Sequence, residues 1–141
     1  MRPSRVVSTC VALFAIALAW NGLVHGLVLR EVDAAVQHLR RAGPGGLLWL
    51  SLPLTAGVVV LFVLGYVRTA RTGSVREGLA YGAAFAVLAG LLVDLNQYLL
   101  YPIPARVALA WFASGLAEFM VYGAVASRFL PPARQAQATQ S

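Results

Sequence analysis

The sequence contains no lysine and few acidic residues. All 11 of its basic residues are arginine, its acidic residues number 5, and charged residues make up only 11% of the 141 residues. The arginines lie between and beside apolar blocks, a position typical of loops that orient membrane helices. No basic stripe with interleaved aromatic residues accompanies the net charge of +6, so we expect no nucleic-acid partner. The arginine-only set, with an excess of Ala, Gly, Leu and Val, is typical of GC-rich bacterial genomes.

Cysteine and histidine are also scarce, which argues against several kinds of site. Cys10 is the sole cysteine, so no disulfide can form within the chain. Of the two histidines only His25 falls in an apolar block, whereas haem b between membrane helices ordinarily takes two. The chain has no HxxxH or HExxH spacing, no GxSxG, no Walker sequence and no CxxC pair. We therefore predict no enzyme activity, no metal and no cofactor.

Hydrophobic residues make up 60% of the chain, and most of them fall in four long blocks. A membrane-spanning helix needs about 20 mostly apolar residues, and each block has this length. The bundle is predicted to be one domain, residues 1–130, followed by a disordered polar tail at 131–141. The sequence thus predicts an all-α membrane protein, an antiparallel bundle of four transmembrane helices at residues 6–29, 47–67, 75–101 and 104–130.

The first block has two interpretations. Ala17-Leu18-Ala19 resembles a signal-peptidase site after a short apolar core. However, the apolar run continues to Leu29, and the bulky Trp20 would directly follow the cut. We favour a retained transmembrane helix, because the whole run has spanning length.

The segments between the blocks contain helix and turn signals. Residues 31–42 have the pattern of a short amphipathic helix that lies at the membrane surface. Ser74 and Glu77 have the spacing of a capping box, with Ser74 as the N-cap of the third helix. The break at Pro102-Ile103-Pro104 is so short that the third and fourth helices should be antiparallel neighbours.

The first and third blocks carry glycines four residues apart, a spacing that lets membrane helices approach closely. The predicted helix-packing residues are Gly22, Gly26, Gly78, Gly82 and Gly90. In the third block the series also includes Ala86, and its next step is Asp94. A carboxyl group at the end of such a ridge should be hidden from lipid by a neighbouring helix.

The distribution of arginines predicts the orientation. The N-terminus, the loop after the second block and the C-terminus hold seven arginines, and the other side holds four. The side richer in arginine is normally cytoplasmic. We expect a multi-pass protein of the bacterial inner membrane with both termini in the cytoplasm.

Five polar residues inside the blocks form the candidate site. They are Asn21, His25, Asp94, Gln97 and Glu118. With a rise of about 1.5 Å per helical residue, the first four fall in one layer of the outer half of the membrane, and Glu118 lies beneath them. An aspartate at the centre of a membrane helix costs about 2.5–3.5 kcal/mol on insertion, so these groups should face the interior of the bundle.

This polar layer has two interpretations. In the first, which we favour, the groups satisfy one another as an interhelical clamp, and the protein is structural or accessory. In the second, His25, Asp94 and Glu118 titrate, Asn21 and Gln97 hydrogen-bond, and the protein is a proton-coupled transporter or binding protein for a small solute. The expected partners are the lipid bilayer and either a second copy of the chain or a subunit of a membrane complex.

Three short patterns resemble small four-helix bacterial membrane proteins that are catalogued as domains of unknown function. The first helix carries Trp20-Asn21-Gly22-x-x-His25-Gly26. The third has GxxxG followed by Asp94 and Tyr98, and the fourth has Gly115, Glu118 and Tyr122-Gly123. The resemblance covers residues 6–130 and implies the fold and the membrane location, but it implies no activity.

Overall fold

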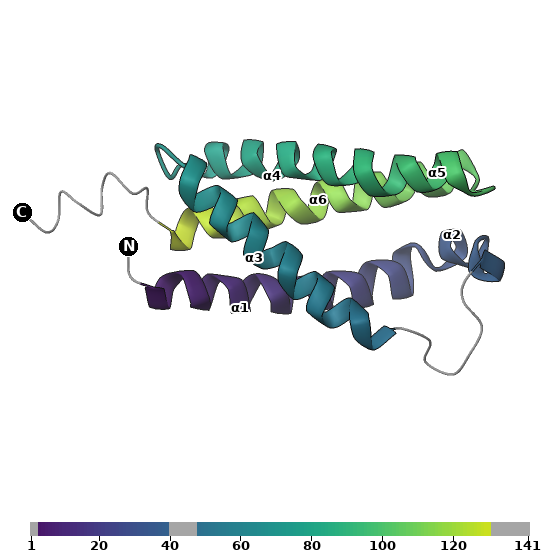
Figure 1. Ribbon diagram of the computed structural model, residues 1–141, viewed down its shortest axis with the longest axis horizontal. Helices are drawn as coiled ribbons and strands as arrows, with labels where there is room; N and C mark the ends of the chain where they lie inside the picture. The colour runs from purple at the N-terminus through teal and green to yellow at the C-terminus, as the bar shows by residue number, and fades with distance from the viewer. Residues whose placement is uncertain (1–2, 40–47, 131–141) are drawn as a thin grey trace, which may run out of the picture.

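The computed structural model describes residues 3–39 and 48–130, and it is helical almost throughout (Figure 1). The predicted tail at 131–141 and the Gly43–Gly46 break lie outside the described residues. The four helices long and apolar enough to span a membrane are Pro3–Val28, Ser51–Thr69, Val75–Leu100 and Ala105–Phe129. They confirm the predicted all-α bundle of four transmembrane helices, and each matches one predicted block with small differences at the ends.

Two of the four spans contain an internal change of helix type. The first consists of α1 (Pro3–Trp20) and a wider π-helical stretch, η1 (Asn21–Val28). The third consists of α4 (Val75–Gly90), a second π-helical stretch, η4 (Leu91–Leu95), and α5 (Asn96–Leu100). The second and fourth spans are the regular helices α3 (Ser51–Thr69), which follows the 3-10 turn η3 (Leu48–Leu50), and α6 (Ala105–Phe129).

The spans alternate in direction, so α1 begins at the end of the bundle where α6 ends (Figure 1). The tight loop between α3 and α4 lies at this same end. Gly73 in that loop has φ of 67°, a backbone conformation that residues other than glycine rarely adopt. The Ser74 hydroxyl accepts a hydrogen bond from the Glu77 backbone N–H at 3.2 Å, as an N-cap does.

Glu77 does more than a capping box requires. Its carboxylate accepts the backbone N–H groups of Arg71, Thr72 and Gly73 at 2.6–2.8 Å. In a capping box such a carboxylate accepts the backbone N–H of the cap residue itself. The Glu77 carboxylate reaches further back instead, because the glycine turn folds three successive N–H groups around it. Glu77 therefore holds the whole loop closed.

The predicted surface helix at 31–42 forms as two short pieces, α2 (Arg30–Ala34) and η2 (Gln37–Leu39). Residues 40–42 lie outside the described residues. The segment packs onto the bundle through its apolar side: Val36 is buried against Ile103 and Val107, with Trp111 beside them. A second small core thus joins this segment to the start of α6.

The closest helix pair is α4 and α6. The small-residue ridge Gly78, Gly82, Ala86 and Gly90 is buried in α4. A methyl group added to Gly82 would overlap the backbone of Phe119, and one added to Gly78 would overlap the backbone of Gly123. The two backbones are therefore in contact, which only glycine at these positions allows.

Aromatic side chains connect α3 to this pair in the half of the bundle where α1 begins. The Phe62 ring contacts those of Tyr81, Phe85, Phe119 and Tyr122 at centroid distances of 5.0–5.8 Å. The Tyr81 hydroxyl also donates to the Phe62 carbonyl at 3.0 Å. This core then includes α1, whose Leu13 and Ala17 are fully buried in it.

The outer surface of the bundle is apolar between its two ends. Leu54, Leu61, Leu92 and Leu99 are all more than 60% exposed. Such a surface is suited to hydrocarbon rather than to water. The polar positions of the spans are described below.

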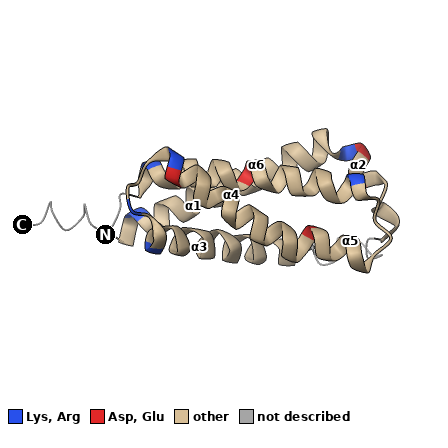
Figure 2. Cartoon of the chain, turned by 90° about the horizontal axis from the view of Figure 1, so that it is seen from above, with Lys and Arg blue, Asp and Glu red and all other residues tan. Residues whose placement is uncertain are grey.

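Charges are distributed unequally between the two ends (Figure 2). The end where α1 begins, called here the arginine end, carries Arg5, Arg68, Arg71, Arg76 and Arg128 among its described residues, against Glu77. At the opposite end, called here the α2 end, Arg30 and Arg106 are matched by Glu31 and Asp33. The described part of the protein is thus basic at one end and balanced at the other.

The glycine contact gives a direct test of the fold. We expect Gly82→Ala to destabilise the protein by about 1–3 kcal/mol, the usual cost of overpacking a close contact, because its methyl group would overlap the Phe119 backbone. The control is Gly57→Ala in α3, where a methyl group would meet nothing within 4 Å. Thermal unfolding in detergent, followed by circular dichroism, measures both. Equal melting temperatures for the two variants would contradict the α4–α6 contact.

Candidate intramembrane polar site

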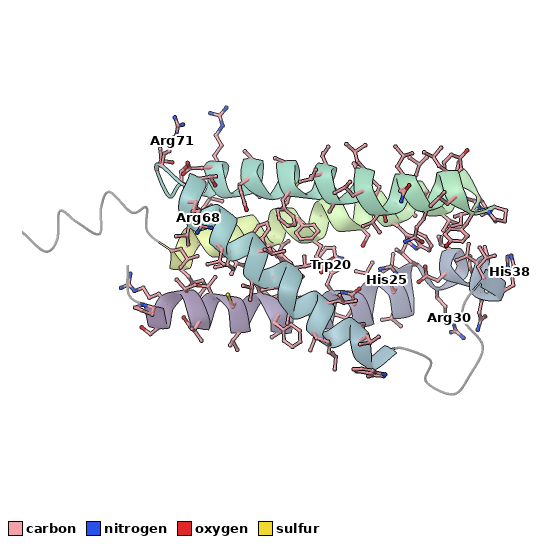
Figure 3. All side chains as sticks on the ribbon, in the orientation of Figure 1. Trp20, His25, Arg30, His38, Arg68 and Arg71 are labelled. Atoms are coloured by element: carbon pink, nitrogen blue, oxygen red, sulfur yellow. The ribbon has the colours of Figure 1, made fainter. Side chains whose placement is uncertain are left out.

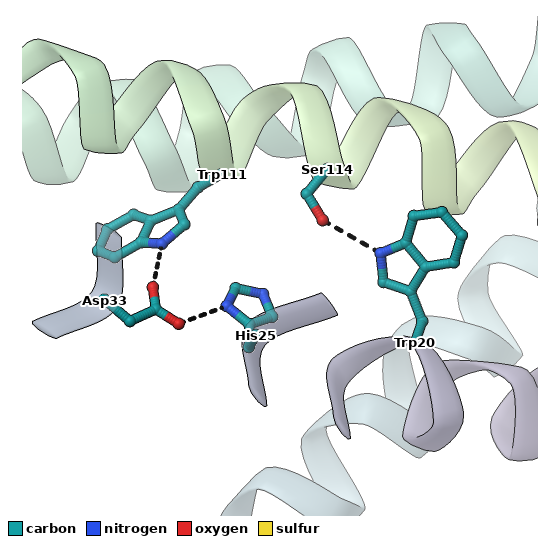
Figure 4. Close-up of polar contacts among 5 residues, drawn as sticks. All are labelled: Trp20, His25, Asp33, Trp111 and Ser114. Atoms are coloured by element: carbon teal, nitrogen blue, oxygen red, sulfur yellow. Dashed lines mark hydrogen bonds and ion pairs between the residues drawn. The ribbon is translucent and has the colours of Figure 1, made fainter. Parts of the chain in front are cut away.

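The five predicted site residues do not form one hydrogen-bonded layer. In the part of the chain that the structure describes, no hydrogen bond joins any two of Asn21, His25, Asp94, Gln97 and Glu118. Each is instead bonded elsewhere or lines a cavity. The side chains that do connect the helices are shown in Figure 4, and all of them except His25 come from outside the predicted set.

Asp33 is the centre of the observed network. One carboxylate oxygen, Oδ2, accepts a hydrogen bond from His25 Nδ1 at 2.9 Å. The other oxygen, Oδ1, accepts the indole N–H of Trp111 at 2.8 Å. Asp33 therefore joins the first span, the α2 segment and α6 (Figure 4).

Partial burial and hydrogen bonds to a charged group stabilise the Asp33 network. The Asp33 side chain is 10% exposed and that of His25 37%. A carboxylate only accepts hydrogen bonds, so His25 must carry its proton on Nδ1. Charge-assisted bonds of this kind are stronger than those between neutral groups, and partial burial shields them from water.

A second polar contact lies about one helical turn away along α6. The indole N–H of Trp20, the last residue of α1, donates to the Ser114 hydroxyl at 3.1 Å (Figure 4). The first span is thus attached to α6 at two levels, directly by Trp20 and through Asp33 by His25. The positions of Trp20 and His25 in the whole bundle can be followed in Figure 3. Asn21 takes no part in this attachment, because its amide donates to the Ala17 carbonyl of its own helix at 2.9 Å.

Glu118 is also bonded within its own helix. The hydroxyl of Tyr122, a buried side chain one turn further along α6, donates to the Glu118 carboxylate at 2.5 Å. Among the described residues, no hydrogen bond or ion pair joins Glu118 to Asp94 or His25.

Asp94 and Gln97 line two different cavities. Asp94 borders a mainly apolar cavity of about 340 Å³ between the third span and the start of α6. Gln97 borders a larger space of about 620 Å³ on the side of the α2 segment, together with Val36 and Trp111. The two side chains, three residues apart, thus face different surroundings.

Both π-helical stretches carry an ionisable residue of the predicted site. His25 lies in η1 and Asp94 in η4. A π-helical turn adds a residue to the α-helical repeat and is frequent at functional sites. It also changes the direction in which later residues point. For this reason the four-residue ridge of α4 does not continue as a regular α-helix to Asp94.

The predicted packing glycines divide into two groups. Gly78, Gly82 and Gly90 are buried against α6. Gly22 and Gly26 are exposed, and a methyl group on either would meet nothing within 4 Å. Among the described residues Gly22 and Gly26 pack against no other helix, because η1 presents them away from the bundle.

The network residues that the sequence did not place in the candidate site are Trp20, Asp33, Trp111 and Ser114. Asp33 belongs to a segment with the pattern of a surface helix, where a carboxylate is expected to face water. The sequence offers one signal for its burial, which is that Asp33 lies beside the apolar positions Val32 and Val36. In the structure Val36 is buried in the contact with α6. Only the folding of this segment onto α6 brings Asp33 to His25.

Among the described residues, no group of three or more His, Cys, Asp or Glu side chains is placed to hold a metal ion. Comparisons with protein-family models, with curated protein sequences and with solved structures find no match to the chain. The geometry of the polar groups is therefore the basis on which a function can be proposed.

The Asp33 network is testable by an isosteric substitution. We expect Asp33→Asn to lower the free energy of unfolding by about 1–3 kcal/mol, the range for bonds to charged groups, because the charge that His25 and Trp111 share is lost. Glu31→Gln, at an exposed neighbouring position, should change stability by less than about 0.5 kcal/mol. Thermal unfolding of both variants in the same detergent gives the comparison, and a fully stable Asp33→Asn protein would rule out the clamp.

Proposed function

We propose that this protein is a small structural or accessory component of the bacterial inner membrane, and that its polar groups act as an interhelical clamp. The observation that carries the proposal is Asp33, which bonds His25 of the first span and Trp111 of α6 at the same time. Trp20 and Ser114 form a second bond between the first span and α6, and Asn21 and Glu118 are bonded within their own helices. Groups that satisfy one another fix the arrangement of helices and leave little for a transport cycle to move.

The proposed orientation places the arginine end in the cytoplasm. The excess of arginine at that end, set against the balanced α2 end, supports it. Both termini would then be cytoplasmic, and the Asp33 network would lie near the outer surface. The choice of the bacterial inner membrane depends on the arginine-rich composition.

An accessory role needs a partner, for which the first span offers a surface. Gly22 and Gly26 are exposed on η1 together with Leu23 and Leu27. Small residues beside leucines permit close helix contact in a membrane. Either a second copy of the chain or another subunit would satisfy this surface.

A second candidate function is a proton-coupled transporter or a binding protein for a small solute. One observation favours it: in the described structure Asp94 forms no hydrogen bond or ion pair and borders a cavity. A carboxyl group of this kind within a membrane span is a reasonable ion or solute site.

The two functions predict different results in liposomes. The clamp predicts no proton or solute flux for the wild type, for Asp94→Asn or for Glu118→Gln. The transporter predicts wild-type flux that both substitutions abolish in protein that remains folded. Native purification adds a second measurement: a constant partner supports the accessory role, and a lone monomer contradicts it.

Orientation can be measured with single cysteines introduced after Cys10→Ser. We expect a membrane-impermeant maleimide to label His38→Cys in intact cells, and Arg71→Cys only after the membrane is permeabilised, because these exposed positions lie at opposite ends of the bundle. The reverse labelling would place the termini outside the cytoplasm.

A further inference from the structure

The cavity beside Asp94 is lined by apolar residues apart from Asp94 itself and Tyr98. It lies between η4 and α5 on one side and the first two turns of α6 on the other. Ala105 and Ala108 leave room on the α6 side, and the exposed Leu91 and Leu109 form its rim toward lipid. Its volume of about 340 Å³ falls in the range of sites for small organic molecules.

Gly90 brings a carboxylate and an aromatic ring together in this cavity. A methyl group on Gly90 would overlap the ring of Phe112 and would lie 3.5 Å from the Asp94 Oδ2 atom. Ring and carboxylate thus lie around the same point on the helix surface. Tyr98, one turn after Asp94, adds a second aromatic side chain to the cavity lining.

Among the residues that the structure describes, no cationic side chain lies within hydrogen-bond reach of the Asp94 carboxylate. In the described parts of the chain the one ion pair joins His25 to Asp33. His25, the histidine of the predicted site, hydrogen-bonds through Nδ1 to Asp33 and not to Asp94. A negative charge partly shielded by apolar walls is costly unless an opposite charge joins it.

We propose that this cavity binds an organic cation with an apolar body, such as a hydrophobic quaternary ammonium or phosphonium ion. The carboxylate of Asp94 supplies the opposite charge. Tyr98 and Phe112 supply aromatic rings, which attract cations that have no hydrogen-bond donors. The apolar rim receives the rest of the ligand from the lipid side.

This site is independent of the clamp. None of its lining residues belongs to the network of His25, Asp33 and Trp111, or to the contact of Trp20 with Ser114. A structural protein and a transporter could both contain such a site. Loss of cation binding would therefore leave the stability effect of Asp33→Asn unchanged, and the two failures can be told apart.

The probe is tetraphenylphosphonium, and tetraphenylborate, which has the same shape and the opposite charge, is its control. The full chain is placed in phosphatidylcholine nanodiscs, and bound probe is measured by equilibrium dialysis with empty nanodiscs subtracted. We expect saturable binding of the cation alone. Asp94→Asn should weaken it by about tenfold or more, the effect of losing one charged contact. Tyr98→Leu should weaken it by about threefold.

Glu31→Gln is the matched variant, because it removes a carboxylate at an exposed position that lies outside the cavity. It should leave binding within about twofold, a difference of less than about 0.5 kcal/mol. Ala105→Phe narrows the cavity without changing charge and should abolish binding, so it gives a decision even if Asp94→Asn does not fold. The proposal is overturned if the wild type does not bind the cation, if it binds the borate equally, or if Asp94→Asn and Ala105→Phe bind as well as the wild type.

Discussion

The backbone contact between α4 and α6 is the constraint on which the remaining structure depends. Gly78 and Gly82 let the two helices meet without intervening side chains, and a bilayer provides no hydrophobic force that would bring them together otherwise. The aromatic side chains of this pair then lie along one edge, where Phe62 of α3 packs against them. Toward the α2 end the same two spans leave the cavity beside Asp94, because the first turns of α6 carry the small residues Ala105 and Ala108.

The two halves of the bundle are held by different means. In the half next to the arginine end, apolar and aromatic packing joins all four spans. Toward the α2 end, the first span is attached to α6 through Asp33, Trp111 and the Trp20–Ser114 contact. Hydrogen bonds are directional, so they fix the position of the first span more narrowly than apolar contacts could. The half with polar contacts also contains the cavities that Asp94 and Gln97 line and the π-helical stretches η1 and η4.

Sequence patterns predicted the helices well because long apolar blocks have few alternatives in a membrane. The ridge in α4 and the N-cap at Ser74 followed from residue spacing alone, and both are present. The predicted polar layer used depth along each helix, which places residues at the right level but does not say which way they point. Asp94 and Gln97 are at similar levels and line different cavities, partly because η4 changes the helix repeat.

The sequence by itself determined the class of this protein, the number of its membrane spans and the ridge that joins two of them. These properties depend on apolar length and on residue size, which are local. The tertiary structure alone decided that Asp33 is buried where it bonds His25 and Trp111. It also decided that Asp94 borders a cavity and has no bonded partner among the described residues. Both outcomes depend on how the short α2 segment and the π-helical turns pack, and no repeat or spacing in the chain encodes that packing.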